Sequence, residues 1–120
     1  MKDHQSLKAW QEARQAAILV IRASRRYWRP WASSVFHQLQ RSSLSVQLNI
    51  AEGASFGPSA TYRRHLGIAY GSAVETCELI TIIVTEDLIP VADAAELQVH
   101  AENSRILLLG LLKRHRPMQR

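Results

Sequence analysis

The chain has 120 residues, 47% of them hydrophobic, with a formal net charge of +5 and a single cysteine. This length allows one domain with a core of its own, so we expect residues 1–120 to form a single domain. A single cysteine excludes a disulfide within the chain and fits a reducing compartment. The longest run without a charged side chain, residues 30–40, is far shorter than the ~20 apolar residues that span a bilayer. Because the N-terminus also lacks an apolar signal segment, we expect a cytoplasmic protein with no membrane association.

Pro30 separates the first two predicted helices, because proline cannot continue a helical hydrogen-bond ladder. Residues 7–28 hold no glycine or proline and carry an apolar stripe that we expect to face the core: Leu7, Trp10, Ala17, Ile21 and Trp28. Beyond the proline, Ser33 or Ser34 can cap a second helix, and Gly53 is expected to end it in a left-handed conformation. The inward residues expected on this second helix are Phe36, Leu39, Ser43, Val46 and Ile50.

The third predicted helix follows a loop at residues 53–58, with Ser59 as its candidate cap. Its apolar positions repeat at spacings of four and three, as in a packed helical seam: Tyr62, Leu66, Ala69, Ala73, Thr76, Ile80 and Ile83. Pro90 fits the first position of a fourth helix that reaches about residue 115. Its expected inward residues include Leu97, Ala101, Leu108 and Leu112. Short connections predict an all-α, antiparallel up-down-up-down four-helix bundle.

Two of these helices are apolar on a second side. The first carries small residues at Ala9, Ala13 and Ala16, and the second carries Leu44, Leu48 and Ala51. A helix in a monomeric bundle needs one wide apolar stripe, so we interpret both stripes as an interface between subunits. The alternative is a broad core face within a small bundle.

The segment 40–53 carries a family resemblance. It reads Gln-Arg-Ser-Ser-Leu-Ser-Val-Gln-Leu-Asn-Ile-Ala-Glu-Gly and is similar to the signature of a four-helix-bundle family whose founders are encoded in intervening sequences of bacterial 23S rRNA genes. The matching positions include Arg41, Asn49, Glu52 and Gly53, and residues 7–13 and 68–75 support the match. Ala73 departs from the pattern, because a bulkier leucine is usual there, and the turn at residues 29–31 is unusually aromatic.

The resemblance implies a cytosolic homopentamer. Relatives include the accessory proteins of diversity-generating retroelements, which are basic pentamers that bind nucleic acid and a reverse transcriptase. RNA or DNA and a reverse transcriptase or other protein are therefore expected partners beside the chain itself. For most of the family no biochemical activity is established, so the resemblance alone names no function.

The sequence carries none of the usual residue patterns for catalysis or metal binding. No glutamate has a histidine three residues later, as a ferritin-like site requires, and one cysteine with five scattered histidines forms no zinc motif. Glu75 and Glu78 are expected to form a solvated face, and Cys77 to be a packed residue. We expect no catalytic site, no metal and no cofactor.

The strongest polar motif is Asn49 with Glu52. The helix dipole disfavours an acid in the last turn of a helix. We therefore expect a cation to pair with Glu52, and the nearest cations in the sequence are Arg63 and Arg64. The pair either fastens the end of the second helix to its neighbours or contacts a ligand. Gly67 and Gly71 are four residues apart on the third helix, where they could admit a neighbouring helix or a tryptophan ring.

The predicted topology gathers basic residues at one end of the bundle. This end collects Lys2, Lys8, Arg63, Arg64, Lys113, Arg114, Arg116 and Arg120, against Asp3, Glu12 and Glu52. The opposite end is balanced between arginines and acids. We expect nucleic acid to bind at Arg63, Arg64, Lys113, Arg114 and Arg116. The alternatives are that basic side chains complement the dipole of the fourth helix, or that the chain is a protein scaffold with contacts at Trp28 and Trp31.

Overall fold

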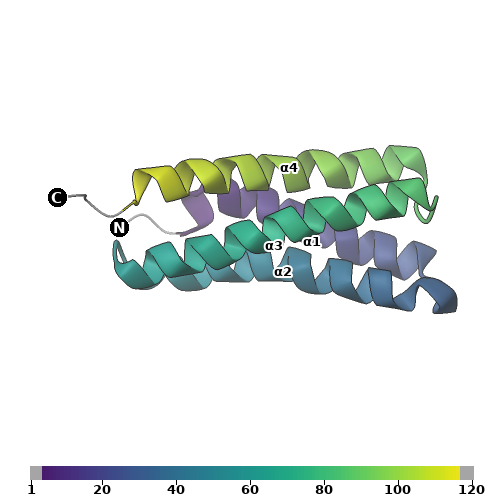
Figure 1. Cartoon of the computed structure of the whole chain (residues 1–120), viewed down its shortest axis with the longest axis horizontal. Coiled ribbons are helices and arrows are strands. Elements are labelled where there is room, and N and C mark those ends of the chain that lie inside the picture. The colour runs from purple at the N-terminus through teal and green to yellow at the C-terminus, as the bar shows by residue number, and fades with distance from the viewer. Residues whose placement is uncertain (1–3, 117–120) are drawn as a thin grey trace.

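Four long helices account for most of the chain in the computed structural model, which describes residues 4–116 (Figure 1). They are α1 (Lys8–Tyr27), α2 (Ser33–Ala54), α3 (Ala60–Thr85) and α4 (Val91–Arg114). Two short 3-10 helices, η1 (His4–Ser6) and η2 (Pro30–Ala32), precede α1 and α2. The described residues include no strand, which confirms the all-α prediction and its four helices.

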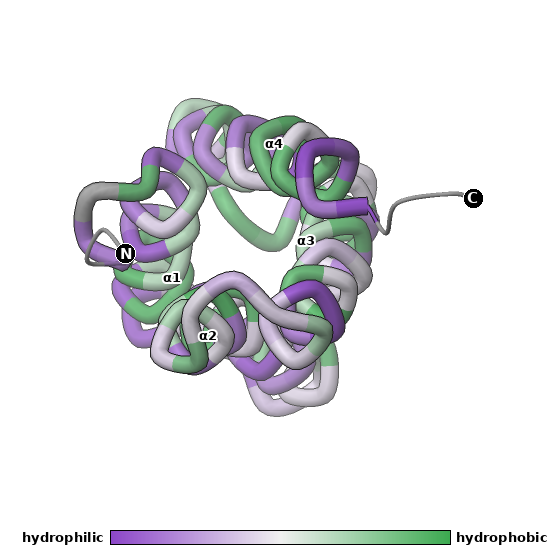
Figure 2. The backbone as a smooth tube through the Cα atoms, turned by 90° about the vertical axis from the view of Figure 1, so that its left-hand side faces the viewer, coloured by the Kyte–Doolittle hydropathy of each residue, from purple (hydrophilic) through white to green (hydrophobic). Residues whose placement is uncertain are grey.

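The helices pack as a square, in which α2 and α4 are the neighbours of both α1 and α3 (Figure 2). Along the α2–α3 boundary, Asn49 meets His65 while Ser45 meets Ser72, so residue numbers rise on one helix as they fall on the other. These pairings and the elongated shape, 51 × 26 × 22 Å, are compatible with the expected up-down order. One end of the bundle therefore holds the start of α1, the end of α2, the start of α3 and the end of α4 (Figure 1).

The core confirms the predictions for α2 and α3 and corrects the one for α1. Every inward residue predicted on α2 and α3 is buried. However, Ile21 on α1 and Trp28 just after its end are exposed, and the buried stripe of α1 consists of small residues: Ala9, Ala13, Ala16, Ala17, Val20 and Ala23. On α4, Leu97, Ala101 and Leu108 are buried as predicted, and Leu111 is buried more deeply than Leu112.

The predicted helix boundaries are right at Ser59 and wrong at Gly53. The Ser59 hydroxyl oxygen accepts a hydrogen bond from the Tyr62 amide at 3.1 Å and so caps α3. Gly53 lies inside α2 with a helical backbone, and the left-handed glycine is Gly57 in the following loop. At the start of α2, the capping position is Ala32, so neither Ser33 nor Ser34 is the cap.

Gly53 is instead a point of close approach between α2 and α3. A Cβ atom built at this position would lie 2.6 Å from the His65 Cβ and 3.2 Å from the Tyr62 Cδ1. Real Cβ atoms essentially never approach another atom to 2.6 Å, so only glycine fits here without displacement of α3. The glycine therefore allows the polar side chains of the two helices to meet.

Candidate nucleic-acid interface

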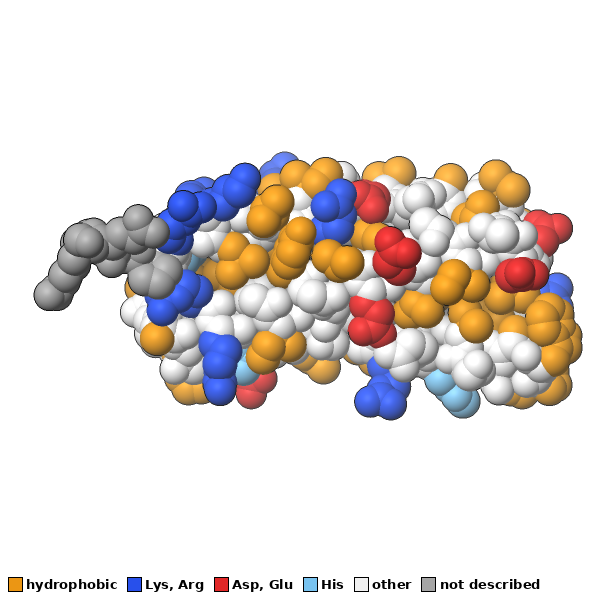
Figure 3. All heavy atoms as spheres, in the orientation of Figure 1, with side chains coloured by type: hydrophobic (Ala, Val, Ile, Leu, Met, Phe, Trp, Pro, Cys, Tyr) orange, Lys and Arg blue, Asp and Glu red, His pale blue; other side chains and the backbone are white. Residues whose placement is uncertain are grey.

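A cluster of cations occupies the end of the bundle where α3 starts and α4 finishes (Figure 3). Its described members are Lys8, Arg63, Arg64, Lys113, Arg114 and Arg116, and we call this group the basic pole. All are exposed except Arg63, which is half-buried. Lys2, Asp3 and Arg120 were also assigned to this end from the sequence, but they lie outside the described residues.

Arg63 differs from the rest of the basic pole because its side chain forms a hydrogen bond between α3 and the end of α4. Its Nη1 donates a hydrogen bond at 3.4 Å to the carbonyl oxygen of His115, just beyond the end of α4. The His115 ring packs edge-on against Tyr62, with 5.1 Å between ring centroids. Arg63 therefore stabilises the end of α4 against α3 and is a weaker candidate for phosphate binding than its neighbours.

The other cations are not neutralised within the described chain. Arg64, Lys113, Arg114 and Arg116 form no ion pair with another residue in the range 4–116. Arg114 is close enough to Tyr62 to oppose the rise in the pKa of that phenol that burial causes. Lys113 and Arg114 also lie in the last turn of α4, where a cation is favoured by the helix dipole. Arg64 is near the start of α3, where the helix dipole does not favour a cation.

The acids predicted at this end bind other partners. The carboxylate of Glu12 is bound by His100, and its Oε1 also accepts a hydrogen bond from Asn103 Nδ2 at 3.1 Å. Glu52 lies 3.7 Å from His65 Nδ1 and forms no ion pair with Arg63 or Arg64, the cations that we expected beside it. Neither acid reduces the positive charge of the exposed pole through an ion pair with it.

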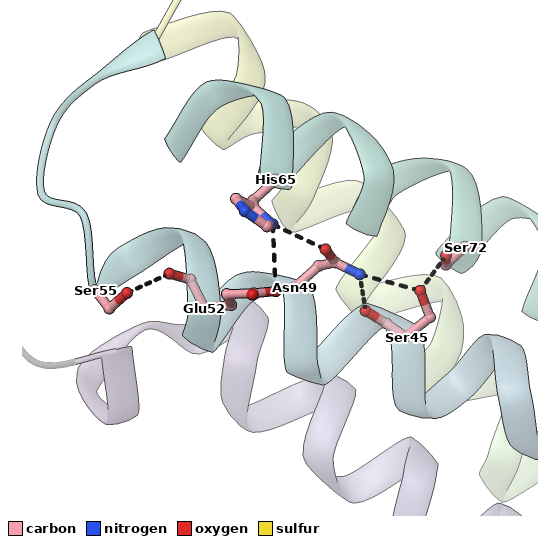
Figure 4. Close-up of polar contacts among 6 residues, drawn as sticks. All are labelled: Ser45, Asn49, Glu52, Ser55, His65 and Ser72. Atoms are coloured by element: carbon pink, nitrogen blue, oxygen red, sulfur yellow. Dashed lines mark hydrogen bonds and ion pairs between the residues drawn. The ribbon is translucent and has the colours of Figure 1, made fainter. Parts of the chain in front are cut away.

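The family motif forms a polar ladder between α2 and α3 (Figure 4). Asn49 donates from Nδ2 to the Ser45 carbonyl at 2.9 Å, while its Oδ1 lies 2.9 Å from His65 Nδ1. The Ser45 and Ser72 hydroxyls are 2.8 Å apart. Both ends of the Asn49 amide are thus used inside the chain, which favours the fastening role over ligand contact.

His65 and Ser72 were not singled out from the sequence. The signal was present in the spacing, because Ser45, Asn49 and Glu52 repeat at four and three residues while His65 and Ser72 are seven apart. Such spacings place each set on one helical side. Arg41 of the motif is exposed beside Ser42 and Ser45, along a shallow polar hollow that Glu75 also lines.

Other titratable groups hold helices together. The Cys77 thiol is buried and hydrogen-bonded to Glu102, and burial followed by that bond raises its pKa from 9.0 to about 12. Arg105, which donates to Glu102 at 2.6 Å, lowers the pKa of that carboxyl. Cys77 is therefore a packed, protonated residue, as expected. Within residues 4–116 no group of three or more His, Cys, Asp or Glu is placed to hold a metal ion.

The interface predicted on α1 is wrong. Ala9, Ala13 and Ala16 are buried inside the single chain, because the small side chains let α1 approach the large core residues of the other helices. The stripe predicted on α2 remains available at the surface, since Leu48 is 58% exposed and Leu44 and Ala51 are half-buried. Trp28 and Trp31 are exposed, with 46% and 73% of their surface accessible.

One described helix, α3, is long and apolar enough by length and composition to cross a membrane. This is weak evidence, because one side of α3 packs in the bundle core.

A basic pole on an all-helical bundle defines the class of protein as a small helical module with a positively charged end. The chain matches the 23S rRNA-intervening sequence protein family over residues 5–110 and belongs to that family. No curated protein matches it significantly.

Proposed function

We propose that this protein is a non-enzymatic, cytoplasmic homo-oligomer, a pentamer of up-down-up-down bundles, that binds nucleic acid through the basic pole. RNA is the expected ligand ahead of DNA. The observation that supports the proposal is the exposure of Arg64, Lys113, Arg114 and Arg116 at one end, with no ion pair to a described acid. A reverse transcriptase or another protein is a further proposed partner, and the membrane is not.

The expected mode of binding is contact with phosphates. Five copies at +5 each carry +25, and copies that stand side by side with the same end up would join their poles into one positive rim. Aromatic side chains that could stack on bases are scarce there, because Tyr62 is buried and Phe56 packs its ring against His65 at 5.9 Å between centroids. Binding should therefore depend on backbone charge and shape, with little sequence discrimination.

The test compares two double charge reversals. Arg64→Glu/Lys113→Glu changes the exposed pole without touching the bond that Arg63 makes to α4. Arg22→Glu/Arg26→Glu makes the same change of charge towards the opposite end of α1. Binding of a labelled RNA duplex is measured by fluorescence anisotropy across a salt titration. The pole variant should bind at least about tenfold more weakly with a shallower salt dependence, because fewer counterions are released.

The matched variant, Arg22→Glu/Arg26→Glu, should retain both the affinity and the salt dependence of the wild type. Loss of binding in that variant alone would move the site to the far end of α1. Absence of binding by the wild type at low salt would contradict the nucleic-acid proposal altogether.

The alternative function is a protein scaffold, and the exposure of Trp28 and Trp31 favours it. Tryptophan is enriched among residues that dominate binding energy at protein interfaces. If the wild type binds no nucleic acid, these two rings are the surface to which a protein partner should bind.

A further inference from the structure

The outer side of α4 carries apolar residues that the single chain leaves in solvent. Val99 and Ile106 are 56% and 57% exposed, and Ala95 and Leu109 are exposed beside them. Together with Glu102 they form a series at spacings of four, three, four and three: Ala95, Val99, Glu102, Ile106 and Leu109. This is the spacing of a helix that packs along a second helix, although nothing in the described chain covers this side.

The adjoining outer side of α3 has the same spacing. Gly67, Gly71, Val74, Glu78 and Thr81 are all exposed, at spacings of four, three, four and three. A Cβ built at Gly67 or Gly71 meets nothing within 4 Å, so the expected neighbouring helix or tryptophan is not supplied by this chain. α3 packs along α4, and Cys77 is close enough to Glu102 of α4 for the carboxylate to raise its pKa, so this side of α3 adjoins α4. We call the two sides together the α3–α4 face, and Figure 3 shows its apolar groups with acids among them.

A second face of matching character lies on the opposite side of the square, over α1 and α2 (Figure 2). Its α1 residues repeat at spacings of four, four, three and four: Trp10, Arg14, Ile18, Ile21 and Arg25. On the other side of α1, Glu12 is bound by His100 of α4. The five residues therefore point away from α4. Leu44 and Leu48 continue the apolar surface onto α2, and we call the whole set the α1–α2 face.

The two faces carry opposite charges. Arg14 and Arg25 are exposed on the α1–α2 face and form no ion pair with a described residue. On the α3–α4 face, Glu78 is exposed and likewise forms no ion pair, while Glu102 is shared with Arg105. Two copies of the same face would bring like charges together, whereas one face against the other brings arginine to glutamate.

The charges also lie at matching heights along the bundle. Glu12 of α1 contacts Asn103 of α4, so Arg14 is within about a turn of Glu102 along the long axis. Arg63 bonds to His115, so in the antiparallel order Glu78, 15 residues further along α3, lies near residue 100 of α4 and within about a turn of Glu102. Copies that stand side by side with the same end up would therefore bring Arg14 of one copy near Glu78 and Glu102 of the next.

We propose that the α3–α4 face is the docking site for the α1–α2 face of a second copy of this chain, in a head-to-tail contact. The inference rests on the self-assembly in the proposed function and adds which surfaces meet. Because each copy presents both faces on opposite sides, every copy can bind two others. A repeated contact of this kind closes into a ring when the rotation between copies is right.

The experiment disables one face at a time. Leu48→Glu introduces a charge on the α1–α2 face, and Ile106→Arg introduces one on the α3–α4 face. Neither residue is buried, so each variant should remain helical by circular dichroism and run as a monomer in light scattering. When the two are mixed, the intact faces should pair, giving a 1:1 dimer of about twice the 13.6 kDa chain mass and nothing larger. Trp31→Glu, an exposed apolar residue outside both faces, should keep the wild-type mass.

Several outcomes would overturn the inference. A mixture that stays monomeric shows that the two faces do not bind one another, and a variant of wild-type mass shows that its face is not used. A variant that loses its helical signal shows that the substituted residue belongs to the core. The milder variants Leu48→Ser and Ile106→Ser are then mixed instead, and the inference again requires a 1:1 dimer. A monomeric wild type contradicts self-assembly itself. RNA binding is scored separately, by the salt titration, so failure of the nucleic-acid proposal leaves this result unaffected.

Discussion

Gly53 shows how one missing side chain sets the distance between two helices. The Cβ that any other residue would carry falls 2.6 Å from the His65 Cβ, which belongs to a stem that cannot rotate away. At Gly110, on the outer side of α4, an added Cβ meets nothing within 4 Å. Both glycines lie within helices, but a side chain added at Gly53 meets α3 whereas one added at Gly110 meets solvent.

Gly53→Ala should lower the free energy of unfolding by about 1–3 kcal/mol, because the methyl group forces α2 and α3 apart. Gly110→Ala should raise it by about 0.5–1 kcal/mol, since alanine favours an exposed helix. Urea unfolding of both variants at one protein concentration measures the difference. Equal effects at the two sites would mean that the close approach at Gly53 does not exist.

Cys77 illustrates a buried group whose ionisation is linked to folding. The folded chain holds the thiol proton to about pH 12, whereas an unperturbed cysteine releases it near pH 9.0. Stability from this group is complete below the unfolded pKa and is lost as the pH rises towards the folded pKa. At pH 8 the folded protein should contain roughly a thousandfold less thiolate than the unfolded chain, from a shift of three pH units.

Alkylation of Cys77 at pH 8 should therefore be at least about a hundredfold slower in the native protein than in denaturant. Mass spectrometry of the modified chain over time gives both rates. Cys77→Ala serves as the control for reaction at other groups. Comparable rates in the two states would show that the thiol is neither buried nor held protonated.

At the scale of elements, the α2–α3 boundary assigns a structural role to the family motif. Asn49 is the centre of the ladder, because its amide reaches Ser45 on its own helix and His65 on the next. Removal of the amide leaves a nearly buried histidine nitrogen without that partner. An unsatisfied buried polar group costs about 1–3 kcal/mol.

Asn49→Ala should lower the free energy of unfolding by about 1–3 kcal/mol while the folded variant keeps wild-type affinity for RNA. Chemical unfolding and anisotropy on the same preparation separate the two properties. Thr61→Ala, on the same side of α3 but outside the ladder, should change neither by more than about 0.5 kcal/mol. A variant with unchanged stability and weaker RNA binding would make Asn49 a ligand contact.

The elements also show what the sequence could and could not predict. The seam of α3 was predicted residue by residue, because its inward positions are both apolar and regularly spaced. On α1 the prediction chose the large residues Ile21 and Trp28, but the core accepts alanines there. Hydrophobic spacing alone cannot choose between two apolar stripes, since the choice depends on the room left by neighbouring helices. In the site, the exposed cations were predictable from topology, while the bond from Arg63 to His115 required the folded chain.

At the scale of the whole molecule, two separations of charge act in different directions. Along the bundle axis, exposed cations gather at the basic pole. Across the axis, the arginines of α1 lie opposite the glutamates of α3 and α4. The charge separation along the axis favours a polyanion at one end of the bundle. The charge separation across the axis favours further copies of the chain at its sides. Side-by-side assembly with the same end up would satisfy both at once, because it multiplies the basic poles without burying them.

Assembly should therefore control how strongly RNA binding depends on salt. Each phosphate neutralised on a duplex contributes about 0.9 to the slope of log affinity against log salt concentration. Monomeric Leu48→Glu presents one basic pole instead of several, so its slope should be less than about half that of the wild type, with weaker affinity at every salt concentration. Trp31→Glu adds the same charge outside both faces and should keep the wild-type slope. If a monomeric Leu48→Glu variant retains the full slope, a single bundle provides the whole binding site, and the continuous positive rim has no role in it.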